Sequence, residues 1–255
     1  MPIVFGPQAL TLIEDVNAGG TGRVQFPDCE RALRNPNGLL ARGGDLSPAW
    51  LLSAYRQGVF PWYNPGETIL WWSPDPRFGF APADVRLGRS RTRNLRARGW
   101  SLTADTCFEK VIRGCADSPR RDQHGTWIDQ AMIDAYCALH RLGIGHSIEV
   151  FDGERLVGGL YGLAIGRMFF AESMFSRESG ASALALAMLA RKLGSWGWPW
   201  IDAQMENPHL VLLGGRNMNR KDYLALVQAE TSKTGMPGSW QAHFSGSDLS
   251  ACLGL

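Results

Sequence analysis

Residues 147–170 read SIEVFDGERLVGGLYGLAIGRMFF, and this stretch decides the fold. Side chains alternate in character over 147–150, as they do in a strand with one buried face. Asp152-Gly153 follows as a signal for a tight hairpin. Residues 156–170 then predict two further strands that turn near Gly166. A sheet built from consecutive strands is therefore expected here.

Helices are expected on both sides of this stretch. Before it, Asp129 can cap a helix that Gly143 closes. After it come a helix at about residues 180–193, a strand at 198–203 and a short helix at 207–214. Helices and strands follow one another in a mixed order, which predicts an α/β (α+β) fold.

The N-terminal part contains its own signals for where a helix begins and ends. A helix is expected between Ser47, which is suited to the N-cap, and Gly58, which is suited to the exit. Prolines are then dense over residues 61–82, where neither a continuous helix nor a central strand can persist. We therefore expect two domains, a small one at residues 1–76 and a larger one at 77–255.

The composition excludes several classes of protein. Of the 255 residues, 45% are hydrophobic and 20% are charged, which is enough for a core and rules out wholesale disorder. No apolar run is long enough for a membrane span, and the first residues lack a cationic secretory lead, so we expect a cytoplasmic protein. Neither the histidines nor the cysteines form a metal-binding pattern or a C-x-x-C pair, so no metal is expected. The cysteines are Cys29, Cys107, Cys115, Cys137 and Cys252.

One segment is strongly basic although the net charge of the chain is only +2. Its thirteen residues contain six arginines and no acid; the arginines are Arg86, Arg89, Arg91, Arg93, Arg96 and Arg98. Such a run is either a phosphate-binding face or simply a solvated helix surface. The absence of compensating carboxylates keeps the first interpretation open.

Three further features point to chemistry. Trp62 and Trp127 lie in loop-like positions, where tryptophan either plugs a core or stacks on a nucleobase. Asp202 and Gln204 follow the expected strand at 198–203, and their spacing of two would put both side chains on one face. Glu172 is flanked by aromatic residues; if it lines a pocket, it would attract a cation.

Several ordered motifs together resemble those of the bacterial leucyl/phenylalanyl-tRNA–protein transferase family. The motifs are NGLLARGGDLS (37–47), FPW (60–62), ILWWSPDPR (69–77), GTWI (125–128), HSIEV (146–150), ESMFS (172–176) and IDAQ (201–204). They run in order through most of the chain, which makes the set far more specific than any one motif.

The resemblance implies a small N-terminal domain packed on a GNAT-like acyltransferase domain with a mixed, largely antiparallel sheet. It implies an enzyme that moves leucine or phenylalanine, and less readily methionine, from aminoacyl-tRNA to the N-terminal Arg or Lys of proteins. The products are thereby marked for N-end rule degradation. No metal or cofactor is implied, and we expect a monomer.

The resemblance also assigns roles to residues. Trp62 and Trp127 would bind the terminal adenosine of the tRNA, and the basic segment would hold the tRNA backbone. The reaction centre would contain Glu172, Asp202 and Gln204. The pocket for the donor side chain would be apolar; its expected members are Leu160, Met174, Phe175 and Leu189.

The expected mechanism relies on positioning. A carboxamide is not a base near neutrality, so Gln204 would accept a hydrogen bond from the attacking amine and orient it. Asp202 would polarise that carboxamide and stabilise the positive charge that develops on the amine. Glu172 and Asp202 together would form a negative mouth that selects a basic N-terminal residue.

Two alternatives remain open at this point. Arg177-x-x-Gly180-x-Ser182 opens the helix expected at 180–193 and is similar to a phosphate-binding helix start, so an acyl-CoA-dependent N-acyltransferase is one of them. The other is a non-catalytic tRNA-binding protein, which would use the arginines and tryptophans but would not need the acids and Gln204 together.

Overall fold

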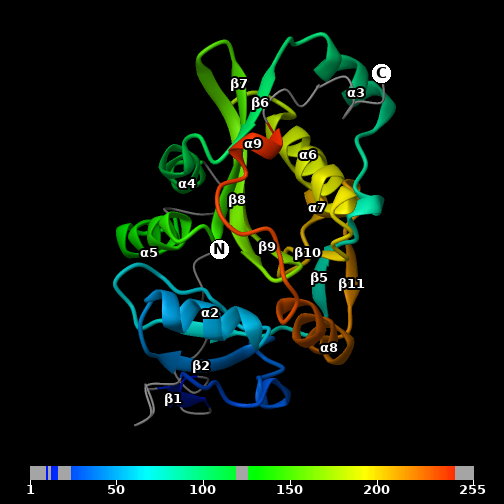
Figure 1. The fold of residues 1–255 in the computed structure, drawn as a ribbon. Helices are drawn as coiled ribbons and strands as arrows, with labels where there is room; N and C mark the ends of the chain where they lie inside the picture. Colours follow the sequence, from blue (N-terminus) through cyan, green and yellow to red (C-terminus); the bar gives the residue numbers. More distant parts are fainter. Residues whose placement is uncertain (1–9, 11–12, 17–23, 119–125, 245–255) are drawn as a thin grey trace.

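The computed structural model describes residues 10, 13–16, 24–118 and 126–244. Gly125 of the GTWI motif and Cys252 lie outside these residues. Within them the strands form two sheets, one of four strands and one of seven (Figure 1).

The first sheet has the order β1-β2-β4-β3. Its strands are β1 (Glu14–Val16), β2 (Leu39–Gly43), β3 (Phe60–Pro61) and β4 (Leu70–Trp72). β1 runs parallel to β2, and the other pairs are antiparallel. Helix α2 (Pro48–Arg56) lies between β2 and β3 in the chain and begins with proline at its first position, as predicted. Ser47 precedes it, but its side chain makes no capping hydrogen bond.

The second sheet has the order β11-β5-β10-β9-β8-β7-β6. Its strands are β5 (Arg77–Phe80), β6 (Ser101–Ala104), β7 (Gly145–Asp152), β8 (Arg155–Ile165), β9 (Met168–Ser176), β10 (Trp200–Asp202) and β11 (Arg216–Met218). Among these described strands, β9 and β10 form the one parallel pair. The predicted mixed α/β class with a largely antiparallel sheet is therefore confirmed.

Helices cover both faces of the second sheet (Figure 1). The remaining helical elements are η1 (Cys29–Arg31), η2 (Pro82–Asp84), α3 (Arg89–Arg96), α4 (Phe108–Ala116), α5 (Gln130–Arg141), α6 (Ala181–Ser195), α7 (Pro208–Leu212), α8 (Arg220–Thr231) and α9 (Gln241–Phe244). Alternating residues of β8 enter different core clusters: Tyr161 joins Phe108 of α4, and Leu160 joins Leu186 of α6. None of the described helices is both long and apolar enough to cross a membrane.

The deciding stretch folds as its pattern predicts. Asp152 pairs with Arg155, so the tight turn between β7 and β8 consists of Gly153 and Glu154, one residue later than the Asp-Gly signal. β8 and β9 turn at Gly166, whose φ of 59° suits glycine. Asp129 caps α5 by accepting a hydrogen bond from the backbone N–H of Met132 at 2.8 Å.

The two sheets part between Trp72 and Arg77, near the expected boundary. Their cores are not separate, however, because one buried cluster contains Trp71 of the first sheet together with Trp200 and Tyr223 from beyond it. The division into domains at residues 1–76 and 77–255 stays a prediction.

Candidate active site

The candidate site lies where the two parallel strands stop pairing. β10 is bonded to β9 at three positions, the last of which joins Asp202 to Phe170. β9 continues beyond this point with β8 on its other side, and there its register shifts: Ser173 pairs with Tyr161, whereas Ala171 pairs with Gly162. Glu172 is the extra residue of this bulge, and a bulge re-aims the side chain that it carries.

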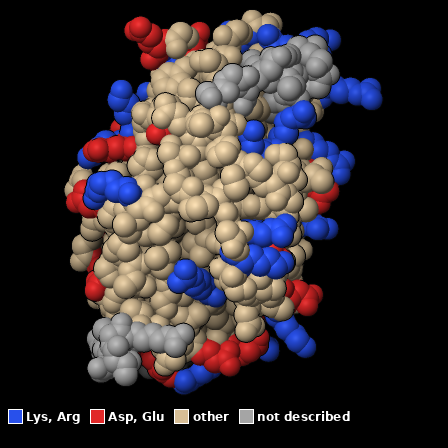
Figure 2. All heavy atoms as spheres, viewed as in Figure 1, with Lys and Arg blue, Asp and Glu red and all other residues tan. Residues whose placement is uncertain are grey.

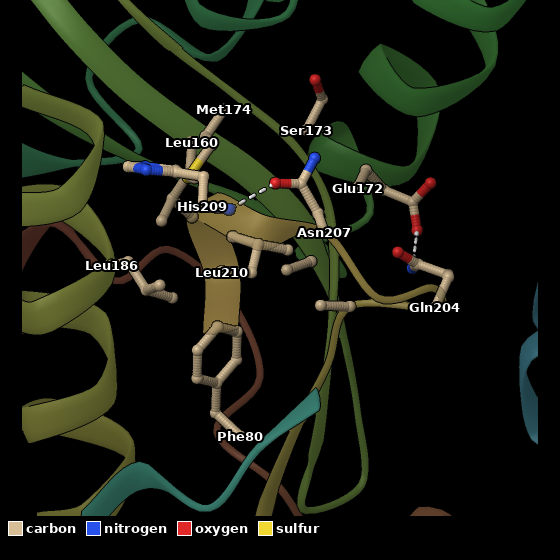
Figure 3. A pocket seen from close by; sticks show the side chains of 12 residues that line it. Phe80, Leu160, Glu172, Ser173, Met174, Leu186, Gln204, Asn207, His209 and Leu210 are labelled. Carbon is tan, nitrogen blue, oxygen red and sulfur yellow. Dashed lines mark hydrogen bonds between the residues drawn. The ribbon is translucent and has the colours of Figure 1, made fainter. Parts of the chain in front are cut away.

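A cavity of about 290 Å³ opens at this point. It is lined by Phe80, Leu160, Ala171, Glu172, Ser173, Met174, Leu186, Ala203, Gln204, Asn207, His209 and Leu210. Figure 3 shows apolar side chains from β8, β9, α6 and α7 on one side and the pair Glu172 and Gln204 on the other. An apolar space with a few polar groups at one end suits a small side chain attached to a polar head.

Glu172 is held by two buried tyrosines. Tyr55 of α2 donates to its Oε1 at 2.7 Å, and Tyr136 of α5 donates to its Oε2 at 3.0 Å. The two hydroxyls also lie 2.5 Å apart. Burial raises the pKa of Glu172 to about 7, although the hydrogen bonds from the tyrosines favour the charged form. The carboxyl group can therefore exchange a proton near neutral pH.

Gln204 connects Glu172 to Asp202. Its side-chain Nε2 donates to Oε1 of Glu172 at 3.4 Å, and its backbone N–H donates to Oδ1 of Asp202 at 3.1 Å. Its φ is 58°, in a region that costs a non-glycine residue on the order of 1–3 kcal/mol. The expectation that both side chains share a strand face is wrong, because β10 ends at Asp202 and the backbone turns there.

Asp202 is sealed inside the protein. Arg77 donates to both of its carboxylate oxygens, from Nε to Oδ1 at 2.8 Å and from Nη2 to Oδ2 at 2.6 Å, and both side chains have no exposed surface. Tyr223 donates to Oδ2 at 2.9 Å. The expected negative mouth of Glu172 and Asp202 is therefore wrong as far as Asp202 is concerned, because a buried guanidinium neutralises its charge. The expected polarisation of the Gln204 carboxamide is also not seen, because the bond runs to the backbone.

Sequence reasoning missed Arg77, Tyr55, Tyr136 and Tyr223. A buried acid at a strand end implies a cationic partner, and this rule alone could have prompted a search for one. Nothing in the spacing singles out Arg77, which is 125 residues away from Asp202.

Two of the four expected donor-pocket residues line the cavity. Leu160 and Met174 do so, but Phe175 and Leu189 do not. Phe175 lies on the opposite face of β9, where its ring lies against Gly114 of α4. Leu189 of α6 is wholly buried in the core, and Leu186, one turn earlier on the same helix, lines the cavity instead.

Trp62 and Trp127 are both half-buried and do not line the cavity. Their neighbours in the chain meet, because Tyr63 donates to Asp129 at 3.4 Å. The structure thus brings the two tryptophan segments together at the junction of the first sheet with α5. Their role in binding adenosine stays a prediction.

The basic segment forms α3 and its flanks. Arg86, Arg89, Arg93, Arg96 and Arg98 are exposed, and Arg91 is half-buried. Figure 2 shows basic side chains gathered over the end of the molecule where α3 lies. Arg98 forms a salt bridge within the protein, because its Nη1 lies 3.5 Å from Oε2 of Glu178. Loss of water contact and the charge of Arg91 lower the pKa of His209 at the cavity, so α3 lies near the cavity rim.

Within the described residues, no three His, Cys, Asp or Glu side chains are grouped so that they could hold a metal ion. The start of α6, which suggested a binding site for coenzyme A, already makes hydrogen bonds within the protein. Ser176 Oγ accepts the backbone N–H of Ser182 at 2.9 Å, and Arg177 donates to the carbonyl of Leu156 at 3.0 Å.

Solved structures with a similar fold are distant. The structure of L-PGS from Bacillus licheniformis covers 53% of this chain and 48% of its own, with a TM-score of 0.36 and 12% identity. A GCN5-related N-acetyltransferase from Kribbella flavida covers 68% and 61%, with a TM-score of 0.35 and 12% identity. Likenesses this low are not evidence of a shared function.

Sequence comparison is decisive. Residues 80–228 match the family model described as leucyl/phenylalanyl-tRNA protein transferase, and residues 44–75 match its N-terminal domain. Leucyl/phenylalanyl-tRNA–protein transferases are 59% identical in Xanthomonas euvesicatoria (89% of this chain, 90% of that protein) and 54% identical in Xylella fastidiosa (86% and 90%). The chain belongs to the leucyl/phenylalanyl-tRNA–protein transferase family.

Proposed function

We propose that this protein transfers leucine or phenylalanine, and less readily methionine, from aminoacyl-tRNA to the N-terminal Arg or Lys of other proteins. The new N-terminal residue would mark those proteins for N-end rule degradation. The observation that carries the proposal, together with the family membership, is an apolar cavity that ends at Glu172 and Gln204. A leucine or phenylalanine side chain fills such a cavity, and its carboxyl ester then lies at the polar end.

The reaction is the attack of an amine on an ester that is already activated. The nitrogen of the acceptor forms a bond to the carbonyl carbon, and the bond from that carbon to the ribose oxygen of the tRNA breaks. The ribose oxygen leaves with a proton, and the amine loses one. The energy lies in the ester, so no cofactor is required.

We assign Gln204 the task of orienting the amine through its carboxamide oxygen. We assign Glu172 the task of accepting the proton, because its pKa of about 7 is suited to proton transfer at cellular pH. Among the described residues that line the cavity, Glu172 is also the one acid, and its carboxylate can attract the cationic N-terminus. Asp202 acts indirectly, by holding the backbone of Gln204.

The body of the tRNA would be held by the arginines of α3 and its flanks. One of them, Arg91, lies near the cavity rim, as its effect on His209 indicates. Trp62 and Trp127 would stack on the terminal adenosine, a contact worth about 1–3 kcal/mol per base. One copy of the chain provides every group in this scheme, so we expect a monomer to be active. The cytoplasm, where aminoacyl-tRNA is used, would be its place of action.

A label-transfer assay tests the proposal. Leucyl-tRNA with labelled leucine and an acyl-CoA with a labelled acyl group are each offered to a peptide that begins with Arg. Label should move from the tRNA alone, and a matched peptide that begins with Ala should remain unlabelled. Transfer from acyl-CoA would favour the acyltransferase alternative. Binding of tRNA without any transfer would favour the non-catalytic alternative.

A further inference from the structure

Arg77 is the residue on which the first sheet and the candidate active site converge. It is the first residue of β5 and has no exposed surface. Burial by itself lowers the pKa of a guanidinium, but the charge of Asp202 outweighs this effect and the pKa of Arg77 is raised. The side chain is therefore a permanent cation inside the protein.

One edge of the guanidinium controls the loop that carries Gln204. Nε and Nη2 take both oxygens of Asp202, and Oδ1 of the same carboxylate accepts the backbone N–H of Gln204. Gln204 makes this contact while its φ is positive. The loop is also bonded to β5, because the Gln204 carbonyl accepts the backbone N–H of Phe78 at 3.2 Å and Ala203 N–H donates to the Phe78 carbonyl at 2.9 Å. The pair of Arg77 and Asp202 adds the bond that fixes the N–H of Gln204, and with it the start of the side chain that enters the cavity.

Two further contacts of the guanidinium, with Gly58 and Phe60, reach the segment that leads to Trp62, and a third reaches Tyr223 of α8. Nη1 donates to the carbonyl oxygen of Gly58 at 3.1 Å. The guanidinium carbon lies 4.7 Å from the ring centre of Phe60 and 4.5 Å from that of Tyr223. Trp62 follows Phe60 by two residues, so the tryptophan segment is in contact with Arg77 through the Phe60 ring.

Lysine cannot reproduce this arrangement. A guanidinium is planar and presents its donors in a fixed fork, which binds one carboxylate with two bonds and a third acceptor at the same time, while its faces stack on rings. An ammonium carries the same charge but has neither the fork nor the faces. Substitution by lysine therefore separates the geometry of Arg77 from its charge.

We propose that Arg77 is a positioning residue that couples the segment carrying Trp62 to the loop carrying Gln204. Docking of the tRNA 3′ end against Trp62 then fixes the carboxamide of Gln204 for the attack on the ester. This inference rests on the proposed function and adds to it a defined link between tRNA binding and transfer.

Kinetics of Arg77→Lys test the link, with Arg42→Lys as the matched control. Arg42 binds Asp15 through the same two atoms, with Nε to Oδ1 at 2.6 Å and Nη2 to Oδ2 at 3.2 Å, but this pair is exposed at the edge of the first sheet. Arg77→Lys should lower kcat for transfer from leucyl-tRNA by about tenfold or more and change KM by less than about twofold. Arg42→Lys should change neither. An unchanged kcat in Arg77→Lys overturns the proposal.

A double-mutant cycle separates coupling from a merely structural role. Trp62→Ala should lower kcat and raise KM in the otherwise unaltered protein. In the Arg77→Lys background it should still raise KM but lower kcat by less than about threefold, since the link is already broken. Additive losses of kcat would show two independent effects and would overturn the proposal. In the Arg42→Lys background, Trp62→Ala should lower kcat by the same factor as in the otherwise unaltered protein.

A milder variant covers the case in which Arg77→Lys fails to fold, as judged by thermal unfolding. Tyr223→Phe removes one donor to Asp202 and keeps the ring that covers Arg77. Tyr223→Phe should itself lower kcat, because Asp202 loses one of its donors, and the same cycle is then run with it. An unchanged kcat in Tyr223→Phe, or additivity with Trp62→Ala, again overturns the proposal. If the unaltered protein transfers no leucine from leucyl-tRNA, the proposed function fails, whereas normal transfer with additive cycles removes the coupling alone.

Discussion

Gln204 and Glu172 meet at the cavity through a hydrogen bond of 3.4 Å from Nε2 to Oε1. This is long for a hydrogen bond, and the other contacts of Glu172, to Tyr55 and Tyr136, are shorter. An incoming amine can therefore replace the amide at Oε1 without disturbing the tyrosines. The pair marks the place where the acceptor nitrogen would enter, and catalytic hydrogen bonds commonly tighten only when substrate is bound.

Glu172→Gln should change the pH dependence of transfer. If Glu172 must be ionised to accept a proton, activity is lost as pH falls through its pKa of about 7. The acceptor amine, with an ordinary pKa of about 7.7–8.0, must also be neutral. Below pH 7, log(kcat/KM) should therefore fall more steeply with decreasing pH in the unaltered protein than in Glu172→Gln, by a slope difference of about one. Parallel profiles would remove Glu172 from the proton transfer.

Tyr136→Phe should move the acid limb of the same profile to higher pH. The Tyr136 hydroxyl stabilises the ionised form of Glu172, so its removal raises the pKa of the acid further. The size of the plateau at high pH should change little, because the carboxylate is still present. Tyr63→Phe is a suitable control, since Tyr63 bonds Asp129 and not Glu172. A limb that stays in place would show that Tyr136 only packs against α2.

Leu186→Ala should shift donor preference from leucine towards phenylalanine. Leu186 lines the cavity, and its truncation leaves room for a larger side chain, so the ratio of kcat/KM values should change by about tenfold. Leu189→Ala is the matched control on the same helix. It should destabilise the protein by about 2–5 kcal/mol, as buried leucine truncations do, without changing the ratio. An equal shift in both variants would mean that the cavity does not hold the donor side chain.

Local signals in the sequence predicted much of the fold and part of the site. The turn at Gly166 and the Asp129 cap depend on neighbouring residues and are readable from the sequence, and the hairpin at 152–155 is readable to within one residue. The bulge at Glu172 was not, because it reflects a register shift between two strands. The bond of Arg77 to Asp202 joins two neighbouring strands that are 125 residues apart in the sequence, and no local pattern contains it.

Side-chain direction explains the remaining errors. Phe175 was expected in the donor pocket beside Met174, but consecutive residues of a strand face opposite sides of the sheet. Asp202 was expected at the mouth of the cavity, but it is buried, and a buried carboxylate requires a cationic partner, here Arg77. The alternation of strand side chains could have excluded one of Met174 and Phe175, but the pairing of Asp202 with Arg77 depends on a contact between distant residues that the sequence alone does not state.

Asp202→Ala should mainly lower the free energy of unfolding. Removal of the carboxylate leaves Arg77 charged and unpaired inside the protein, a loss that typically costs about 3–5 kcal/mol. Asp202→Asn retains an acceptor for one donor of Arg77 and should be less destabilised. Denaturant unfolding of both variants measures this difference. Equal stability of Asp202→Ala and the unaltered protein would contradict the buried ion pair itself.

Replacing arginines of α3 should weaken tRNA binding in a way that depends on salt. Arg89 and Arg93 are exposed and lie in a segment without acids. Each contact with a phosphate releases counterions, so the double variant Arg89→Ala/Arg93→Ala should reduce the slope of log K against log salt by about one per arginine. The loss should be nearly equal for leucyl and phenylalanyl tRNAs, because phosphates carry no sequence information.

Arg31→Ala provides the comparison for this last measurement. Arg31 is also exposed, but it pairs with Glu14 beside the first sheet rather than lying on α3. Its replacement should leave both the affinity and the salt slope unchanged. A salt slope that falls equally in both variants would point to a diffuse electrostatic effect of net charge, and an unchanged slope in the α3 variant would show that this helix is only a solvated surface.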